Sequence, residues 1–164
     1  MSDTPETPLG SYIEHTNLRP DATAADIEKL CAEAIEHELF AVCVNGSWVQ
    51  HAASYLEDAD VSIATVIGFP LGASDSDSKR YETEAAVDNG AHEIDMVMNV
   101  GALKSGDDEF VRRDIAGLAE ICHKHGAALK VILETCLLDR DEIVRACTLA
   151  KLAGADFVKT STGF

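Results

Sequence analysis

The feature that most limits what this chain can fold into is an alternation of short apolar runs with longer amphipathic stretches. The apolar runs are rich in Val and Ile and nearly continuous, which is typical of parallel strands covered by helices. They predict strands at 41–45, 62–68, 93–99, 128–134 and 156–160, with a weaker strand at 12–14. Strands that alternate with helices pair in parallel through right-handed crossovers, so the sequence predicts an α/β fold.

The amphipathic stretches carry signals for helix ends. Thr23 with Asp26 resembles a capping box that opens a helix through about His37, and Asp139 with Glu142 resembles a second one. Glycines stand where such helices would end. These glycines are Gly90, Gly126 and Gly154.

Two architectures fit this pattern, a doubly wound open sheet and a (β/α)8 TIM barrel. No G-x-G-x-x-G follows the first strand, which removes the main support for a dinucleotide-binding sheet. Polar residues recur late in successive strands, at Asp95, Lys130 and Lys159, which is the barrel pattern. Six strands cannot close an eight-stranded barrel. We therefore expect one incomplete TIM-barrel domain over residues 1–164, holding about the first six βα units.

Charge and cysteine content limit the partners and the compartment. The formal net charge of −16 is spread over the predicted helix faces and repels nucleic acid and anionic membranes, so neither is an expected partner. A salt-rich cytoplasm would screen such an acidic surface. The five cysteines form no C-x-x-C pair, which favours a reducing compartment. With no signal-peptide pattern and no long apolar run, we expect a cytoplasmic protein.

Lys159 is the first candidate for chemistry. It follows Phe157 and Val158 in the last predicted strand, where burial should lower the pKa of its amine and favour attack on a carbonyl. The alternative is a structural lysine whose stem packs while its head reaches solvent or an acid.

Asp95 and Lys130 lie on neighbouring predicted strands. A carboxylate within the apolar run 94–97 needs a partner, and a pair with Lys130 is either a buried ion pair or a couple that transfers protons.

Other polar residues give weaker signals. The turn that begins at Thr160 and contains Thr162 could hold a phosphate oxygen or cap a helix, and the loop 68–72 is structural by default. Cys43 resembles a small core residue, and nothing local decides the role of His15. The run 122–125 lacks the spacing of a metal site, and we expect it at the surface, with no metal or other cofactor.

Taken together, these segments resemble the deoxyribose-phosphate aldolase family along nearly the whole chain. The matching blocks are IEHTNLRPDAT, AVCVN, TVIGFPLG, EIDMVMNVGALKSG, LKVILETCLL and GADFVKTSTGF. The opening block departs from the family pattern at Glu14, Asn17 and Arg19, where Asp, Leu and Lys are usual. These changes put only fine substrate preference in doubt.

The resemblance implies roles for individual residues. Lys159 matches the lysine that forms a Schiff base, Asp95 matches the acid that shuttles protons, and Lys130 matches a supporting lysine that faces the same pocket. Positions that match substrate-binding or pocket-lining residues are Thr16, Cys43, Thr160 and Thr162. The family continues through two more βα units, which carry a second catalytic lysine and most of the phosphate site.

The activity implied is reversible cleavage of 2-deoxy-D-ribose 5-phosphate to acetaldehyde and D-glyceraldehyde 3-phosphate by a class I aldolase, a lyase of deoxyribonucleotide and carbohydrate catabolism. It needs no cofactor, and a homo-oligomer, a dimer or a tetramer, is expected. Two alternatives stay open at this point. One is another Schiff-base barrel lyase, such as a transaldolase-like enzyme. The other is an inactive, truncated fragment, because open sheet edges expose unpaired backbone groups.

Overall fold

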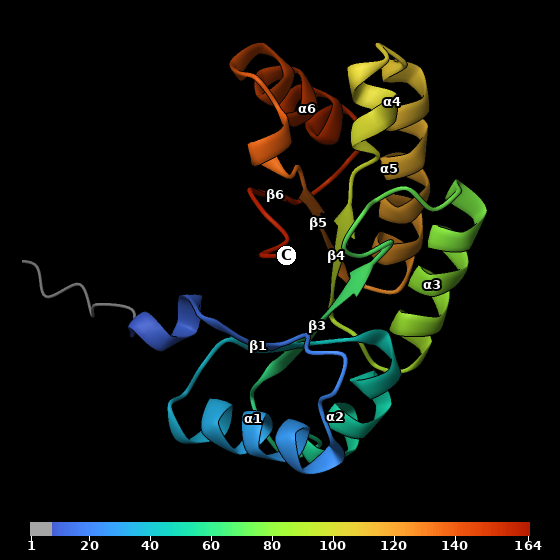
Figure 1. Cartoon of the computed structure of the whole chain (residues 1–164). Helices are drawn as coiled ribbons and strands as arrows, with labels where there is room; N and C mark the ends of the chain where they lie inside the picture. Colours follow the sequence, from blue (N-terminus) through green and yellow to red (C-terminus); the bar gives the residue numbers. More distant parts are fainter. Residues whose placement is uncertain (1–7) are drawn as a thin grey trace, which may run out of the picture.

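The computed structural model describes residues 8–164, which form one parallel sheet flanked by helices (Figure 1). The expectation that the chain has no signal peptide concerns its first ten residues, and residues 1–7 lie outside this range. The strands are β1 (Glu14–Asn17), β2 (Ala41–Val44), β3 (Ser62–Ile67), β4 (Glu93–Val97), β5 (Ala128–Ile132) and β6 (Phe157–Lys159). The helices are α1 (Ala24–Glu36), α2 (Val49–Tyr55), α3 (Ser76–Asp88), α4 (Val100–Lys104), α5 (Asp108–Lys124) and α6 (Arg140–Leu152), with 3-10 turns η1 (Leu9–Tyr12), η2 (Gly46–Trp48) and η3 (Thr135–Leu137).

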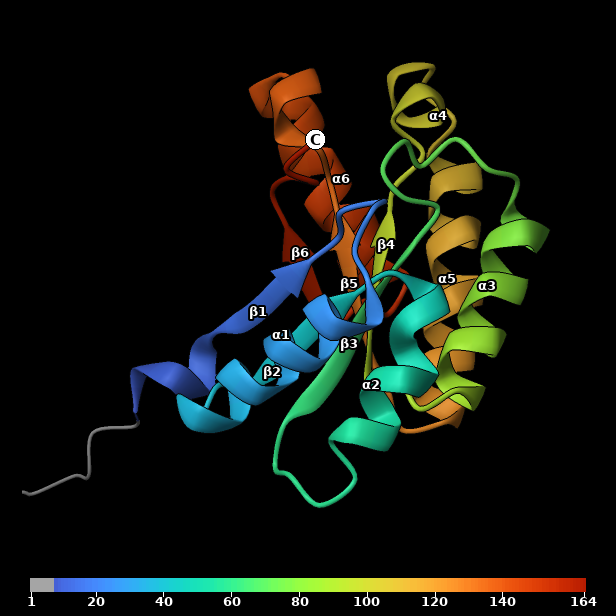
Figure 2. The ribbon, with the colours of Figure 1, turned by 60° about the horizontal axis from the view of Figure 1, so that its bottom comes forward.

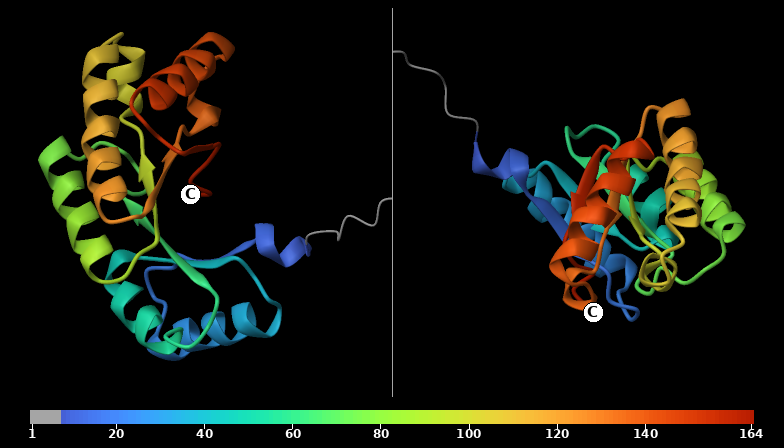
Figure 3. Two further views of the ribbon diagram at one scale, coloured as in Figure 1. Left: turned by 180° about the vertical axis from the view of Figure 1, so that it is seen from behind. Right: turned by 90° about the horizontal axis from the view of Figure 1, so that it is seen from above.

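The strands follow one another in chain order, β1-β2-β3-β4-β5-β6, and every neighbouring pair is parallel. The sheet is strongly curved, with the helices on its convex side and the chain end marked C on its concave side (Figures 1 and 3). A doubly wound sheet would reverse its strand order and carry helices on both faces. The structure is instead a half-barrel built from six βα units of a TIM-barrel fold, as the sequence predicts.

The strand register sorts the side chains between two environments. Successive side chains of a strand point to opposite faces, and paired residues of neighbouring strands point to the same face. The concave face is therefore shared by Glu14, Ala41 and Ser62, which are paired across β1, β2 and β3. The same register puts Asp95 opposite Lys130 on that face, two residues after Glu93 and Ala128. The concave face therefore carries the charged residues of the strands.

The hydrophobic core lies between the convex face of the sheet and the helices. Its strand members alternate with the residues of the concave face and are completely or almost completely buried; they include Val42, Val44, Ile63, Ile94, Met96, Leu129 and Val131. At about 25 cal/mol per Å² of buried apolar area, this layer is the main favourable contribution to folding. The core thus positions the strands while leaving their other face free for polar groups.

The predicted helix ends are confirmed. Thr23 and Asp26 form a capping box at the start of α1, and Asp139 and Glu142 form one at the start of α6. The glycines at the predicted helix ends have positive φ, which suits glycine because it has no Cβ. They are Gly90, Gly126 and Gly154.

Three details differ from the sequence prediction. Tyr12 belongs to η1, and the first strand begins only at Glu14, because residues 9–12 close a short helical turn. The short helix α4 precedes α5 and was not predicted, since its five residues are too few to show helical periodicity. The last strand is not buried: Phe157 and Val158 are 57% and 46% exposed, because β6 has a neighbouring strand on one side only.

Candidate active site

Five charged side chains converge on the concave face of the sheet. This charged cluster consists of Glu14 from β1, Glu93 and Asp95 from β4, Lys130 from β5 and Lys159 from β6. Glu14 is 116 residues from Lys130 and 145 residues from Lys159 in the chain, so its contacts exist only because the sheet curves. Figure 2 shows the first and last strands, β1 and β6, in a second orientation.

Lys159 binds two carboxylates. Its Nζ donates to Oδ2 of Asp95 over 2.5 Å and to Oε2 of Glu14 over 3.2 Å. The Asp95 side chain is 1% exposed, whereas that of Lys159 is 33% exposed. The amine is therefore anchored by a buried acid, while one third of the Lys159 side chain stays exposed.

Lys130 lies deeper in the same cluster, with 6% of its side chain exposed. Its Nζ donates to Oε1 of Glu14 over 2.5 Å and also contacts Glu93. Oδ1 of Asp95 lies 3.3 Å from the same nitrogen but makes no hydrogen bond of good geometry. Asp95 therefore lies between the amines of Lys130 and Lys159, an arrangement that fits both an ion-pair network and a proton-transfer couple.

Burial and charge act in opposite directions on these amines. Burial by itself lowers the pKa of Lys159, but the attraction of Asp95 and then Glu14 outweighs it, so the pKa is raised. Burial also lowers the pKa of Lys130, but contacts with Asp95, Glu14 and Glu93 outweigh burial. The pKa of Lys130 is therefore raised as well. Burial raises the pKa of Glu14, but the hydrogen bond from Lys130 and the charges of both lysines leave it lowered.

The prediction that the pKa of Lys159 is lowered overall was wrong, although burial acts in the predicted direction. Two carboxylates contact the amine, and favourable charges stabilise the protonated form more than burial destabilises it. The raised pKa favours the protonated form of the Lys159 amine.

Cys43 lies on the concave face of β2 and is 2% exposed. Burial, and next the charge of Asp95, raises the pKa of its thiol to about 12. The thiol is therefore protonated at neutral pH, which suits a small pocket-lining group and not a nucleophile.

The threonines lie at the carboxyl ends of the strands. Thr16 and Thr162 line one hollow of about 560 Å³, together with the residues that follow β1 and the chain end at Phe164. Thr162 is half-buried, and both its amide and its hydroxyl donate to Glu134. Thr160 is exposed, does not line this hollow, and contributes a backbone carbonyl to Thr135.

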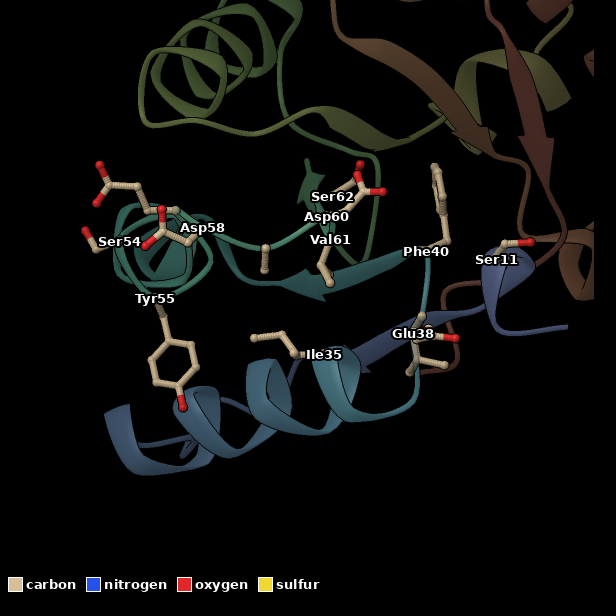
Figure 4. Close-up of a pocket in the computed structure, with 13 residues that line it drawn as sticks. Ser11, Ile35, Glu38, Phe40, Ser54, Tyr55, Asp58, Asp60, Val61 and Ser62 are labelled. Carbon is tan, nitrogen blue, oxygen red and sulfur yellow. The ribbon is translucent and has the colours of Figure 1, made fainter. Parts of the chain in front are cut away.

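A larger hollow, also lined by described residues, lies elsewhere. It measures about 820 Å³ and is formed by segments that precede β2 and β3, including Glu38, Phe40, Asp58 and Asp60 (Figure 4). Sites of (β/α)8 barrels form at the carboxyl ends of the strands, whereas this hollow lies at their amino ends. Its size therefore carries less weight than the chemistry of the charged cluster.

The remaining candidates have structural partners. His15 points away from the concave face and pairs with Glu33 of α1 at 2.8 Å. In the run 122–125, Cys122 is buried in the core, and His123 pairs with Asp156 at the surface. Across residues 8–164, no three His, Cys, Asp or Glu side chains are grouped as a metal site, and no helix is both long and apolar enough to cross a bilayer.

Sequence reasoning missed two members of the charged cluster. Glu14 drew notice only as a departure from the family pattern, and Glu93 was treated as the first residue of a strand. A period-2 count back from Asp95 places Glu93 on the same face and could have found it. No local signal could have found Glu14, because its lysine partners are more than a hundred residues away.

Comparison with known proteins shows the family of this chain. A family model described as DeoC/LacD family aldolase matches residues 11–164. The chain belongs to this aldolase family. Among curated relatives, the deoxyribose-phosphate aldolase of Thermococcus gammatolerans is 54% identical over 158 residues, and that of Brevibacillus brevis is 57% identical over 156 residues.

Each of these alignments covers 95% of this chain and 70% of the relative. A solved deoxyribose phosphate aldolase from Aeropyrum pernix, which is tetrameric, superposes with a TM-score of 0.88 at 33% identity. The superposition covers 94% of this chain and 64% of the solved chain. The family's members here are thus longer than the 164 residues of this chain.

Proposed function

We propose that this chain carries the Schiff-base chemistry of a deoxyribose-phosphate aldolase, with Lys159 as the nucleophile. The reaction is the reversible cleavage of 2-deoxy-D-ribose 5-phosphate into acetaldehyde and D-glyceraldehyde 3-phosphate. The observation that carries the proposal is the 2.5 Å contact between the Lys159 amine and the buried carboxylate of Asp95. The names of the relatives support the choice of substrate.

The first step frees the amine. The Lys159 ammonium passes a proton to Asp95, which lies within direct transfer distance, and the neutral amine adds to the C1 aldehyde of the sugar. Asp95 then returns the proton to the hydroxyl group of the carbinolamine, which leaves as water. Lys130, close to the other oxygen of Asp95, holds that carboxylate in place and stabilises its negative charge.

The second step breaks the C2–C3 bond. Asp95 takes the proton of the C3 hydroxyl, directly or through a water molecule, and C3 becomes the aldehyde of glyceraldehyde 3-phosphate. The electron pair of the broken bond flows to the iminium nitrogen and gives an enamine on Lys159. Protonation of the enamine carbon and hydrolysis of the iminium release acetaldehyde and restore the amine.

In this proposal Thr16 and Thr162 bind the substrate at the carboxyl ends of the strands. Cys43 lines the pocket wall, and Thr160 lies in the same turn as Thr162 and also contributes to substrate binding. We assign this enzyme to a reducing cytoplasm and to a homo-oligomer. The five cysteines are free, and the Aeropyrum pernix relative is tetrameric.

The test is reductive trapping. The chain is incubated with acetaldehyde and borohydride, and its peptides are mapped by mass spectrometry. A stable adduct is expected at Lys159 in the unaltered chain and in a Lys151→Arg control, which changes an exposed lysine of α6. Lys159→Arg keeps the positive charge but cannot form an imine, so the adduct should vanish. An adduct that persists elsewhere at the same yield refutes the assignment.

Product analysis tests the substrate. Incubation with 2-deoxy-D-ribose 5-phosphate should release acetaldehyde, and a Lys159 adduct without that release would favour another Schiff-base lyase.

A further inference from the structure

Glu134 occupies an unusual backbone position beside the proposed nucleophile. It follows β5 and has φ 54° and ψ 63°, the left-handed region that a residue with a side chain rarely adopts. Conformations of this kind persist only where surrounding contacts impose them, and they gather at functional sites. The contacts of the Glu134 side chain therefore call for a physical explanation.

The carboxylate of Glu134 fastens the turn that follows β6. Its Oε2 accepts a hydrogen bond of 2.5 Å from the hydroxyl of Thr162 and one of 3.3 Å from the Thr162 amide. These two bonds satisfy both donors of Thr162. Glu134 thus combines a left-handed backbone with a side chain that reaches from the end of β5 to this neighbouring turn.

The adjoining backbone makes the same link. The amide of Leu133 donates to the carbonyl of Lys159 over 2.9 Å, and the amide of Thr135 donates to the carbonyl of Thr160 over 2.8 Å. Together with the side chain of Glu134, these bonds extend the pairing of β5 and β6 beyond Ile132 and Lys159, their last paired residues.

This link matters because β6 is short. The strand has three residues, Phe157–Lys159. Lys159 is its last residue, and the amine must reach Asp95 on β4, beyond the intervening β5. A small displacement of the turn after β6 would therefore separate the amine from its acid.

We propose that Glu134 is a positioning residue for Lys159: its carboxylate fastens the Thr162 turn to the end of β5 and so keeps the Lys159 amine at Asp95. The inference rests on the proposed function, since it assigns Glu134 to the same site. Glu134 touches no reacting atom and acts only through the turn and the strand.

The experiment measures the ionisation of Lys159 by its reactivity. The chain is pulsed with acetic anhydride at a series of pH values, and acetylation of Lys159 is quantified by peptide mass spectrometry, with the exposed Lys151 as internal reference. No aldolase activity is needed. Because the contacts with Asp95 and Glu14 raise the pKa of Lys159, their loss should move the midpoint of its labelling curve to lower pH.

Glu134→Ala should show this shift, with labelling below the midpoint faster by about threefold or more, since one pKa unit corresponds to tenfold. Glu134→Gln should stay close to the unaltered chain, because its amide oxygen can accept both bonds from Thr162. The matched control Glu120→Ala, an exposed glutamate of α5, should change nothing. An unshifted midpoint in Glu134→Ala, or an equal shift in Glu134→Gln, overturns the proposal.

A second variant guards against simple unfolding. Thr162→Val removes the hydroxyl donor from the other side of the link and should move the Lys159 midpoint in the same direction. When Thr162→Val is combined with Glu134→Ala, the midpoint should move little further, because both changes break the same hydrogen bond. General unfolding would also expose Lys130, whose labelling reports it, whereas full additivity of the two changes counts against the proposal. If the Lys159 midpoint moves as expected in Glu134→Ala but no borohydride adduct forms in the unaltered chain, the proposed function is refuted and the role of Glu134 stands.

Discussion

At the residue scale, Glu14 is the second carboxylate, after Asp95, that raises the pKa of the proposed nucleophile Lys159. The side chain of Glu14 is one methylene longer than the aspartate that is usual at this position in deoxyribose-phosphate aldolases. Its two carboxylate oxygens contact different lysines, Lys130 and Lys159. A single side chain from β1 thus couples the protonation of both amines.

Glu14→Gln should speed the trapping of acetaldehyde at neutral pH. The carboxylate of Glu14 helps to raise the pKa of Lys159, so its removal lowers that pKa and enlarges the neutral fraction of the amine. Each unit of decrease corresponds to about a tenfold gain in that fraction. The rate of borohydride trapping between pH 6 and about 10 checks this. A slower reaction at every pH would show that Glu14 does more than set the charge.

The same carboxylate should give the fold an acid-sensitive component. The folded-state pKa of Glu14 lies below its ordinary value of 4.5, so its contribution is present above that value and is lost as pH falls through the folded-state pKa. The free energy of unfolding of Glu14→Gln, measured by urea denaturation, should therefore fall less steeply in acid than that of the unaltered chain. Parallel curves for the two chains would contradict this linkage.

Asp95→Asn should slow the proton transfers of the reaction. The amide cannot accept protons, so the exchange of the methyl protons of acetaldehyde for deuterium, which passes through the imine, should slow by about 10²- to 10⁴-fold. The control Asp60→Asn changes an exposed residue of the hollow in Figure 4 and should leave the exchange unaltered. A large effect of Asp60→Asn would move the site to that hollow.

At the element scale, a buried ion pair joins helices α3 and α5 to the end of β4. The Nζ of Lys79, fully buried, donates to Oδ2 of Asp114 over 2.6 Å and to the carbonyl of Val97 over 3.1 Å. Ser76 donates to the other oxygen of Asp114. These contacts hold the two helices, which lie side by side in Figures 1 and 2, to the strand that carries Asp95.

Lys79→Met should lower the free energy of unfolding by about 3–5 kcal/mol, because it leaves the charge of Asp114 buried without its partner. The double variant Lys79→Met/Asp114→Leu should recover most of that loss, since it removes both charges. Urea denaturation of the two variants measures the difference. Equal losses would mean that packing volume, and not charge, determines the stability here.

At the scale of the whole molecule, the net charge of −16 opposes the compact state. The midpoint of thermal unfolding should therefore rise as KCl is added. Most of the rise should come below about 0.15 M, where the screening length has already fallen to about 8 Å. A matched series in sucrose controls for the stabilisation that any solute excluded from the protein surface produces, because sucrose does not screen charge. A melting temperature that is flat in dilute salt would show that the repulsion is negligible.

Much of the fold could be predicted from the sequence because its signals are local. The buried strands, the two capping boxes and the glycines at helix ends depend on residues within a few positions of one another, and the structure confirms them. The order of six motif blocks likewise predicted the aldolase family, which the family model confirms. The exposure of β6 was missed because it depends on the neighbouring strands, and the late start of β1 was missed because residues 9–12 close a 3-10 turn.

The chain by itself thus determined the parallel βα pattern and named Lys159, Asp95 and Lys130 as the residues to examine. Only the tertiary structure decided that Glu14 joins them and that the pKa of Lys159 is raised. The reason is physical: the direction of a pKa shift depends on which charges lie within a few ångströms. Here those charges come from β4 and β1, and the curvature of the sheet brings them to Lys159 on β6.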